Sequence, residues 1–175
     1  YKFRIGDLLF GKPIINEERF SFLELGDKKI VRVNLVGNIV DKYERAPGVL
    51  NEDIVDYNPG KKYDIIITIS TLEHVGWNEK PREPLKIFKA IENLKRLLIT
   101  GGKIIITIPK GHNPVLDNLI MEDKLPFTRS FFLKRVSKNN KWKQVSRKKI
   151  SNVKYGSYAR WSASAVIIGY IIFNS

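Results

Sequence analysis

Cysteine is missing from this chain of 175 residues. Its absence excludes disulfides, thiolate nucleophiles and cysteine-ligated zinc. Only two histidines are present, His74 and His112, so we expect no metal site. Because disulfides are typical of oxidising compartments, a chain without them has the cytoplasm as its default expected location.

Long apolar runs are also missing. The longest, residues 165–173, has the length of a strand and is interrupted by Gly169, whereas a transmembrane helix needs about 18 or more apolar residues. We therefore expect no membrane span. Hydrophobic residues still make up 43% of the chain, which is enough for a core, and the length fits a single domain over residues 1–175.

Acidic residues are scarce in one part of the chain. Residues 123–160 hold twelve Lys and Arg against one acid, whereas residues 39–64 hold more acids than bases, and the net charge is +13. Such an excess favours a polyanionic partner such as nucleic acid. Aromatic residues interleaved with the bases suit phosphate contacts and base stacking. The alternative is a solvated lysine-rich surface whose aromatic residues face the core.

The middle of the chain is predicted to form a strand–helix–strand unit. Residues 63–70 (YDIIITIS) and 103–109 (KIIITIP) are nearly continuous β-branched runs, typical of strands buried on both faces. Between them, residues 82–98 place apolar side chains along one helical stripe, and Gly101-Gly102 favours a helix end. This order predicts a crossover connection and a parallel sheet.

Shorter elements are predicted on both sides of this unit. They are a strand over 30–36 that ends at Gly37-Asn38, an extended segment over 49–53, a helix over 114–121, a basic β-hairpin over 129–147 and a strand over 165–173. Residues 1–30 are interpreted as an N-terminal extension, in which Asn16 would cap a short helix. Residues 123–160 are interpreted as a basic elaboration of the domain.

Two of these segments resemble the class I S-adenosylmethionine-dependent methyltransferases. YDIIITISTLEHVG, residues 63–76, is similar to the fourth-strand motif of that family, and LKRLLITGGKIIITIPKG, residues 94–111, is similar to the helix, glycine turn and fifth strand that follow. The resemblance covers residues 37–111. It implies an α/β fold with a Rossmann-like, mostly parallel sheet flanked by helices, an antiparallel C-terminal strand and, here, a basic β-hairpin.

The resemblance also implies S-adenosylmethionine as cofactor and a set of residues around it. An acid after the second strand usually holds the ribose hydroxyls, and Asp41 matches that position; one carboxylate can accept from two hydroxyls. An acid after the third strand takes the adenine amino group, and Asp53 matches best, with the Ile54 amide facing the ring and Asp56 as the alternative. Ser70 and Thr71 would line the methionine arm.

Glu73 and His74 follow at the mouth that would face the methyl acceptor, and they are the candidate catalytic residues. A histidine is a suitable general base near neutral pH. Many methyl transfers, however, need mainly proximity and alignment, because the sulfonium is already activated. The alternative is structural: His74 would cap or pack at a helix start, and Glu73 would support the fold.

The chain departs from the family at its first motif, which is a strand, a glycine-rich turn and a helix. Here VRVNLVGN is followed directly by IVDKYE, so the helix has no room. Gly37, with Asn38 beside it, is the one glycine that would let the backbone approach the cofactor. Either the protein lacks this motif or a stretch near Asn38 is absent from the chain.

Three functions follow from these patterns. The first is an S-adenosylmethionine-dependent methyltransferase with an unknown methyl acceptor. The second is a methyltransferase-like binding protein without catalysis, which the shortened first motif suggests. The third is a nucleic-acid-binding or RNA-modifying protein that uses residues 123–160. A dinucleotide oxidoreductase is disfavoured, because G-x-G-x-x-G does not occur in the sequence.

Overall fold

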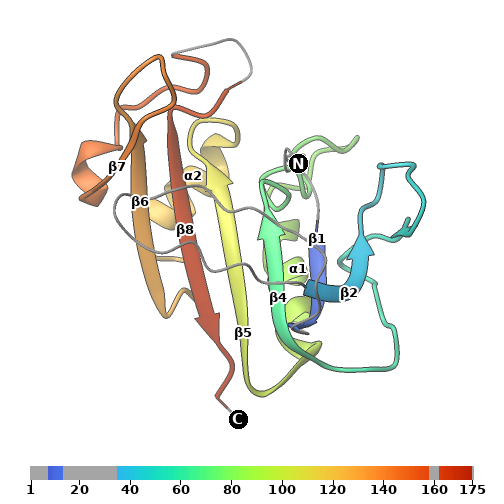
Figure 1. Ribbon diagram of the computed structural model, residues 1–175. Coiled ribbons are helices and arrows are strands. Elements are labelled where there is room, and N and C mark those ends of the chain that lie inside the picture. Colours follow the sequence, from blue (N-terminus) through green and yellow to red (C-terminus); the bar gives the residue numbers. More distant parts are fainter. Residues whose placement is uncertain (1–7, 14–34, 158–161, 175) are drawn as a thin grey trace.

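The computed structural model describes residues 8–13, 35–157 and 162–174. These residues form one eight-stranded sheet and two α-helices (Figure 1). The strands are β1 (Leu8–Pro13), β2 (Leu35–Val40), β3 (Val49–Leu50), β4 (Tyr63–Ile69), β5 (Leu98–Pro109), β6 (Arg129–Arg135), β7 (Trp142–Val145) and β8 (Ala165–Ile172). The helices are α1 (Lys86–Arg96), α2 (Pro114–Met121) and the short 3-10 helix η1 (Arg147–Lys149).

The strand order across the sheet is β3-β2-β1-β4-β5-β8-β6-β7. Two neighbouring pairs are parallel, β2 with β3 and β4 with β5. Strand β1 is antiparallel to both β2 and β4, and β8 is antiparallel to both β5 and β6. Because β1 reverses direction between them, β2 and β4 point the same way. The carboxyl ends of β2, β3, β4 and β5 therefore lie at one edge of the sheet.

This architecture corrects the expectation of a Rossmann-like, mostly parallel sheet flanked by helices. The sheet is mixed, and the described residues hold only two α-helices, both drawn behind the sheet in Figure 1. A Rossmann-like sheet instead has helices over both faces. The links between β2 and β3 and between β3 and β4, residues 41–48 and 51–62, contain no helix. The first link is too short for a helical crossover, which needs about a dozen residues or more.

The core lies on the face of the sheet that the helices cover. Alternate residues of the central strands are buried there, among them Ile66 of β4, Ile104 of β5 and Ile167 of β8, each fully inaccessible. Ile91 and Leu94 of α1 belong to the same apolar cluster. On the other face the alternating side chains are only half-buried. Burial on one face explains why exposure alternates along β8 although its sequence is apolar throughout.

The predictions for β4, α2, the β6–β7 hairpin and β8 are confirmed by the positions of these elements. Helix α1 begins at Lys86 rather than at residue 82. Pro84 explains the delay, because a proline disfavours helical conformation in the residue before it, here Glu83. Asn113 caps α2: its Oδ1 accepts from the amides of Val115 and Leu116, both at 3.1 Å.

The predicted glycine stop of α1 is wrong. The helix ends at Arg96, and Gly101 and Gly102 lie within β5. The ladder explains their role, because the register between β4 and β5 shifts after the pair of Tyr63 and Leu98. The extra β5 residues bulge out, and Gly101 adopts a positive φ of 77° there, a conformation that favours glycine.

The predicted strand end at Gly37-Asn38 is also wrong. Strand β2 passes through both residues, and Gly37 pairs with Gly11 and Asn38 with Phe10 of β1. No turn forms, because the ladder with β1 continues to Val40. Most of the strand predicted over 30–36 and the predicted cap at Asn16 lie outside the described residues.

Candidate ligand-binding site

A pocket opens at the edge of the sheet where β2, β3 and β4 end. Its volume is about 100 Å³, below the ~300–1,000 Å³ of sites that enclose a whole drug-sized ligand, so it suits one part of a ligand. The lining residues are Val40, Asp41, Lys42, Tyr43, Glu52, Asp53, Ile54, Thr71, His74, Val75 and Glu79. Five residues predicted from the sequence meet here from three segments of the chain: Asp41, Asp53, Ile54, Thr71 and His74.

Asp41 is fixed in a tight turn directly after β2. Its Oδ1 accepts hydrogen bonds from the backbone amides of Tyr43 and Glu44, both at 2.8 Å, which makes an Asx-turn. Asn51, after β3, donates to the carbonyls of Asp41 and Glu44 at 2.9 and 2.7 Å. Within the described part of the chain Oδ2 of Asp41 has no hydrogen-bond partner, so this oxygen is available to a ligand.

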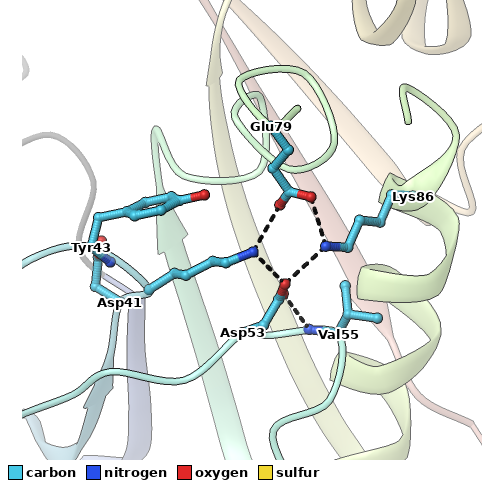
Figure 2. Close-up of polar contacts among 7 residues, drawn as sticks. Asp41, Tyr43, Asp53, Val55, Glu79 and Lys86 are labelled. Atoms are coloured by element: carbon cyan, nitrogen blue, oxygen red, sulfur yellow. Dashed lines mark hydrogen bonds and ion pairs between the residues drawn. The ribbon is translucent and has the colours of Figure 1, made fainter. Parts of the chain in front are cut away.

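Asp53 belongs to a closed ring of alternating charges with Lys42, Glu79 and Lys86, which we name the four-charge ring (Figure 2). Lys42 Nζ lies 2.8 Å from Asp53 Oδ2 and 3.3 Å from Glu79 Oε1. Lys86 Nζ lies 2.8 Å from both Asp53 Oδ2 and Glu79 Oε2. Each charge thus has two opposite charges beside it, which locks the segments after β2, β3 and β4 onto α1.

The four-charge ring holds Asp53 in its ionised form. Burial opposes ionisation, but hydrogen bonds from Lys42, Lys86 and the Val55 amide outweigh it and lower the pKa of Asp53 to about 2. The hydrogen bond to Asp53 in turn raises the pKa of Lys42. Both Asp53 oxygens are therefore engaged, Oδ1 by the Val55 amide at 3.1 Å and Oδ2 by the lysines.

Ile54 lines the pocket and is 6% exposed. Asn93 of α1 holds this segment, because its Nδ2 donates to the carbonyls of Ile54 at 2.7 Å and Tyr57 at 2.9 Å. The Ile54 amide has no acceptor among the residues that the structure describes. It is thus a backbone donor without a partner among those residues, in a segment that lines the pocket.

Three predicted cofactor residues do not line this pocket. Gly37 is part of the β2 ladder, and the side chain of Asn38 bonds to the Tyr57 hydroxyl at 2.9 Å and to Lys61 at 2.8 Å. Ser70 is buried, and its amide donates to the Thr107 carbonyl at 2.9 Å. Its φ of 49°, uncommon for serine, makes the sharp turn that leads β4 into Thr71.

The two histidines of the chain meet beside the pocket. The ring centroids of His74 and His112 are 4.5 Å apart in an edge-to-face arrangement, and His112 contacts Tyr155 at 5.7 Å. His74 Nε2 lies 3.7 Å from Oε1 of Glu73, and its Nδ1 lies 2.8 Å from Asn78 Nδ2. We name Glu73, His74 and His112 the histidine cluster. It joins the ends of β4 and β5.

Burial sets the protonation of the histidine cluster. Glu73 is 1% exposed, and burial raises its pKa to about 8. Burial lowers the pKa of His74, assisted by the neighbouring His112, and burial also lowers the pKa of His112. At neutral pH the three side chains are therefore mostly uncharged. A titratable set with such shifts beside a pocket is a candidate for proton transfer.

A second, open groove of about 560 Å³ lies behind His112. Its lining residues are Lys110, Gly111, Ser151, Asn152, Val153, Lys154 and Tyr155. Gly111 approaches Tyr155 so closely that a Cβ would lie 2.8 Å from the Tyr155 amide nitrogen, which requires glycine. The Gly111 amide donates to Asp117 Oδ2 at 2.9 Å, and Lys110 pairs with the same oxygen at 3.5 Å. These contacts fix the turn that carries His112.

Exposed lysines gather at the edge of the sheet opposite β3, on and after the β6–β7 hairpin. They are Lys138, Lys141, Lys143, Lys148 and Lys149. The two nearby aromatic residues of β6 point to opposite faces of the sheet: Phe132 is 8% exposed and belongs to the core, whereas Phe131 lies on the other face and packs edge-on against Tyr170 at 5.7 Å. Arg147 pairs with Asp123 and lies over Phe132. Phe132 thus fits the alternative of a solvated surface with aromatic residues turned to the core, whereas Phe131 does not.

Three residues of the site had no signal that separated them in the sequence, whereas a fourth, His112, had one. Lys42, Glu79 and Lys86 come together only through the path of residues 76–86, which passes Pro81 and Pro84. His112 lies in the turn after β5. It follows β5 as His74 follows β4, and the rule that parallel strand ends share an edge indicates their meeting.

Comparison with known proteins gives no relative: no family model, curated protein or solved structure matches this chain. Among the described residues, no three His, Asp or Glu side chains are placed to hold a metal ion. In the same part of the chain neither helix has the length and hydrophobicity to cross a bilayer.

Proposed function

We propose that this chain is an S-adenosylmethionine-dependent methyltransferase whose cofactor binds at the carboxyl ends of β2, β3 and β4. The observation that supports this proposal is the convergence of Asp41, Ile54 and Thr71 around one pocket. The resemblance of the sequence assigns these positions to the ribose, the adenine and the methionine arm of the cofactor. Strand ends of this kind are the usual ligand site of α/β sheets.

The contacts give each residue a role in this proposal. Asp41 Oδ2 accepts from the ribose hydroxyls, while Oδ1 keeps the turn. The Ile54 amide donates to the adenine ring. Asp53 is already bonded through both oxygens, so we assign it to holding the Ile54 segment rather than to the adenine amino group. The cofactor supplies an activated methyl group, and the protein aligns it with the acceptor.

The proposal is tested by calorimetric titration with S-adenosylmethionine and S-adenosylhomocysteine. We expect the wild-type chain to bind with Kd in the micromolar range, about −8 kcal/mol. Asp41→Asn preserves an acceptor for the Asx-turn but replaces one carboxylate oxygen by a donor, and should weaken binding at least about tenfold. Asp64→Asn, half-buried at the opposite end of β4, is the matched control and should bind normally.

Two results would contradict the proposal. One is a folded wild-type chain that binds neither compound; the other is equal affinity of wild type and Asp41→Asn. If the cofactor binds but no acceptor is methylated, the alternative of a binding protein without catalysis gains support. A cytoplasmic location, which the lack of cysteine favours, stays a prediction.

Nucleic acid is a second candidate partner. The observation that favours it is the group of exposed lysines after β6, since none of Lys138, Lys141, Lys143, Lys148 and Lys149 forms an ion pair within the described residues. Phosphate contacts by these lysines would make RNA affinity fall steeply with added salt. Double replacement of Lys148 and Lys149 by Ala should flatten that dependence. Absence of RNA retention at low salt would remove this candidate.

A further inference from the structure

The face of the sheet away from the two α-helices carries aromatic rings (Figure 1). Phe131 of β6 and Tyr170 of β8 lie on neighbouring strands of this face, and their ring centroids are 5.7 Å apart in an edge-to-face arrangement. Trp142 of β7 is on the same face, because it pairs with Arg135, an even number of residues along β6 from Phe131. All three rings are partly exposed.

Two of these rings have an arginine directly across the ladder. The register pairs Arg129 with Tyr170 and Arg135 with Trp142, and residues opposite each other on antiparallel strands share a face, with Cβ atoms about 5 Å apart. Arg129 is exposed, and the guanidinium of Arg135 donates to the carbonyls of residues 137 and 138 at 3.1 and 2.8 Å. We name the three rings and the two arginines the aromatic platform.

The surroundings of the aromatic platform are positively charged. Strands β5, β6, β7 and β8 contain no Asp or Glu. The exposed lysines described above lie on and after the β6–β7 hairpin, so they border the platform along the edge of the sheet. A polyanion is therefore the partner whose charge complements this face.

Exposed rings beside bases favour a single strand over a duplex. Phosphate contacts need positive charge alone, and a duplex offers its phosphates without unstacking its bases. Unpaired bases, in contrast, expose π-faces that stack on aromatic side chains, and open sheet faces with aromatic rings bind single strands in this way. Phe131 and Tyr170 lie outside the apolar core that contains Phe132, so burial in that core does not explain them.

We propose that the aromatic platform binds single-stranded nucleic acid, whose bases stack on the rings while its phosphates contact the arginines and the bordering lysines. This inference rests on the second candidate function, nucleic-acid binding, and does not depend on the cofactor pocket. Trp142 pairs with Arg135, which is four residues or about 13 Å along β6 from Phe131, so Phe131 and Trp142 contact different bases. Every base has a π-face, so we expect little sequence preference.

Fluorescence anisotropy with labelled oligonucleotides tests the inference. The probes are an oligouridylate and an oligothymidylate of about ten nucleotides and an RNA duplex of the same length. At low salt we expect both single strands to bind at least about tenfold more tightly than the duplex, whose bases are stacked on one another. The two single strands distinguish RNA from DNA as the source of the strand, and a preference for either is consistent with stacking.

Variants separate stacking from charge. Phe131→Leu and Tyr170→Leu each remove one ring but keep an apolar side chain, and each should weaken single-strand binding about tenfold. Neither should change the salt dependence of binding, because no charge is lost. Arg129→Gln should instead reduce the slope of affinity against salt by about one. Trp77→Leu is the matched control: its ring packs on Arg82 at 4.5 Å in the segment after β4, and the variant should bind normally.

A second measurement on the wild-type chain covers the case in which the ring variants fail to fold. Titration with the oligouridylate should give saturable shifts of the amide NMR signals of residues 129–135 and 165–172, which form β6 and β8. Shifts confined to residues 138–149 would place the strand on the lysines alone and would overturn the inference.

The remaining outcomes are also distinct. Equal affinity for single strands and duplex, with no weakening in Phe131→Leu or Tyr170→Leu, overturns this inference and leaves binding of nucleic acid by the lysines in place. Failure of wild type to bind any probe at low salt overturns both, without bearing on the cofactor pocket. A wild-type dimer that Phe131→Leu dissociates assigns this face to a second copy of the chain and also overturns the inference. Preferential binding of single strands that both ring variants weaken supports it.

Discussion

The four-charge ring and the histidine cluster lie on two sides of the same pocket and differ in how their ionisable groups are satisfied. In the four-charge ring every carboxylate contacts two ammonium groups, and every ammonium contacts two carboxylates. In the histidine cluster Glu73 Oε2 and His112 Nε2 are buried without partners. The first arrangement fixes protonation, and the second leaves it easy to change.

This difference indicates a division of labour. Mutual pairing lowers the pKa of Asp53 to about 2, so the four-charge ring does not titrate near neutral pH and serves to hold the chain segments of the pocket. Burial without a partner raises the pKa of Glu73 to about 8, close to the pH at which a proton acceptor is most effective. The following changes test this comparison, from the largest expected effect to the smallest.

Glu73→Gln should have the largest effect, and the effect should depend on pH. The folded state keeps a proton on Glu73 up to a pKa of about 8, while the unfolded state loses it near its ordinary value of 4.5. Stability from this group is therefore complete below pH 4.5 and is lost as pH rises through 8. In urea unfolding, the free energy of unfolding of the variant should rise by about 4 kcal/mol relative to that of wild type between about pH 5 and about pH 8.

The raised pKa of Glu73 would be refuted if the stability difference between Glu73→Gln and wild type were the same at about pH 5 and about pH 8. Glu122→Gln, with an exposed carboxylate, serves as the control for this measurement and should show no such pH dependence.

Lys86→Met should have the next largest effect on stability, because it opens the four-charge ring and leaves Asp53 and Glu79 to share Lys42. We expect a loss of about 2 kcal/mol in the free energy of unfolding at neutral pH. Asp53 has a lowered pKa, so its stabilisation is present above about pH 4 and is lost as pH falls through 2. The cost of Lys86→Met should shrink accordingly in acid.

Lys95→Met is the matched control on the same helix, because Lys95 pairs only with the exposed Glu92 at 3.0 Å. Equal destabilisation by Lys86→Met and Lys95→Met in urea unfolding would mean that the four-charge ring contributes no more than a surface pair.

Asn93→Leu should have a smaller effect of about 1–2 kcal/mol on stability. It removes the donor for the carbonyls of Ile54 and Tyr57, which are left without that partner. The Ile54 amide should then be less well placed, so S-adenosylhomocysteine binding should weaken as well. Unfolding and calorimetry measure the two effects. Asn118→Leu, an exposed change on α2, should alter neither the stability nor the binding. Retained binding of S-adenosylhomocysteine by Asn93→Leu would exclude Ile54 from the site.

Glu122→Gln should have the smallest effect, below about 0.5 kcal/mol. The ion pair of Glu122 with Lys124 is shorter, at 2.6 Å, than any in the four-charge ring, but both side chains are more than half exposed. Water screens such a pair. A cost above about 1 kcal/mol in urea unfolding would show that distance, rather than burial and mutual pairing, decides the strength of ion pairs in this protein.

The sequence predicts the local elements better than their assembly. The β-branched run of residues 65–69 predicts β4, the apolar run of residues 165–173 predicts β8, and the apolar stripe predicts α1, because these signals arise from neighbouring residues. The mixed sheet was not predictable in this way. It depends on β1 pairing antiparallel between β2 and β4, a choice between distant segments. The extension of β2 through Gly37 follows from the same pairing.

Several candidate site residues were predictable because they lie in the segments that follow the strands. Asp41, Ile54, Thr71 and His74 reach one pocket because they follow strands whose carboxyl ends share an edge. The engagement of Asp53 was not predictable, since the lysines that bond to it come from two other segments.

The most direct test of the cofactor pocket is an amide NMR titration of the 175-residue chain with S-adenosylhomocysteine. We predict saturable shifts of the amide signals of Asp41, Ile54 and Thr71, which surround the pocket. The signals of residues 138–149, which form the basic edge of the sheet opposite β3, should change little. Absence of shifts, or shifts confined to that basic edge, would contradict the account.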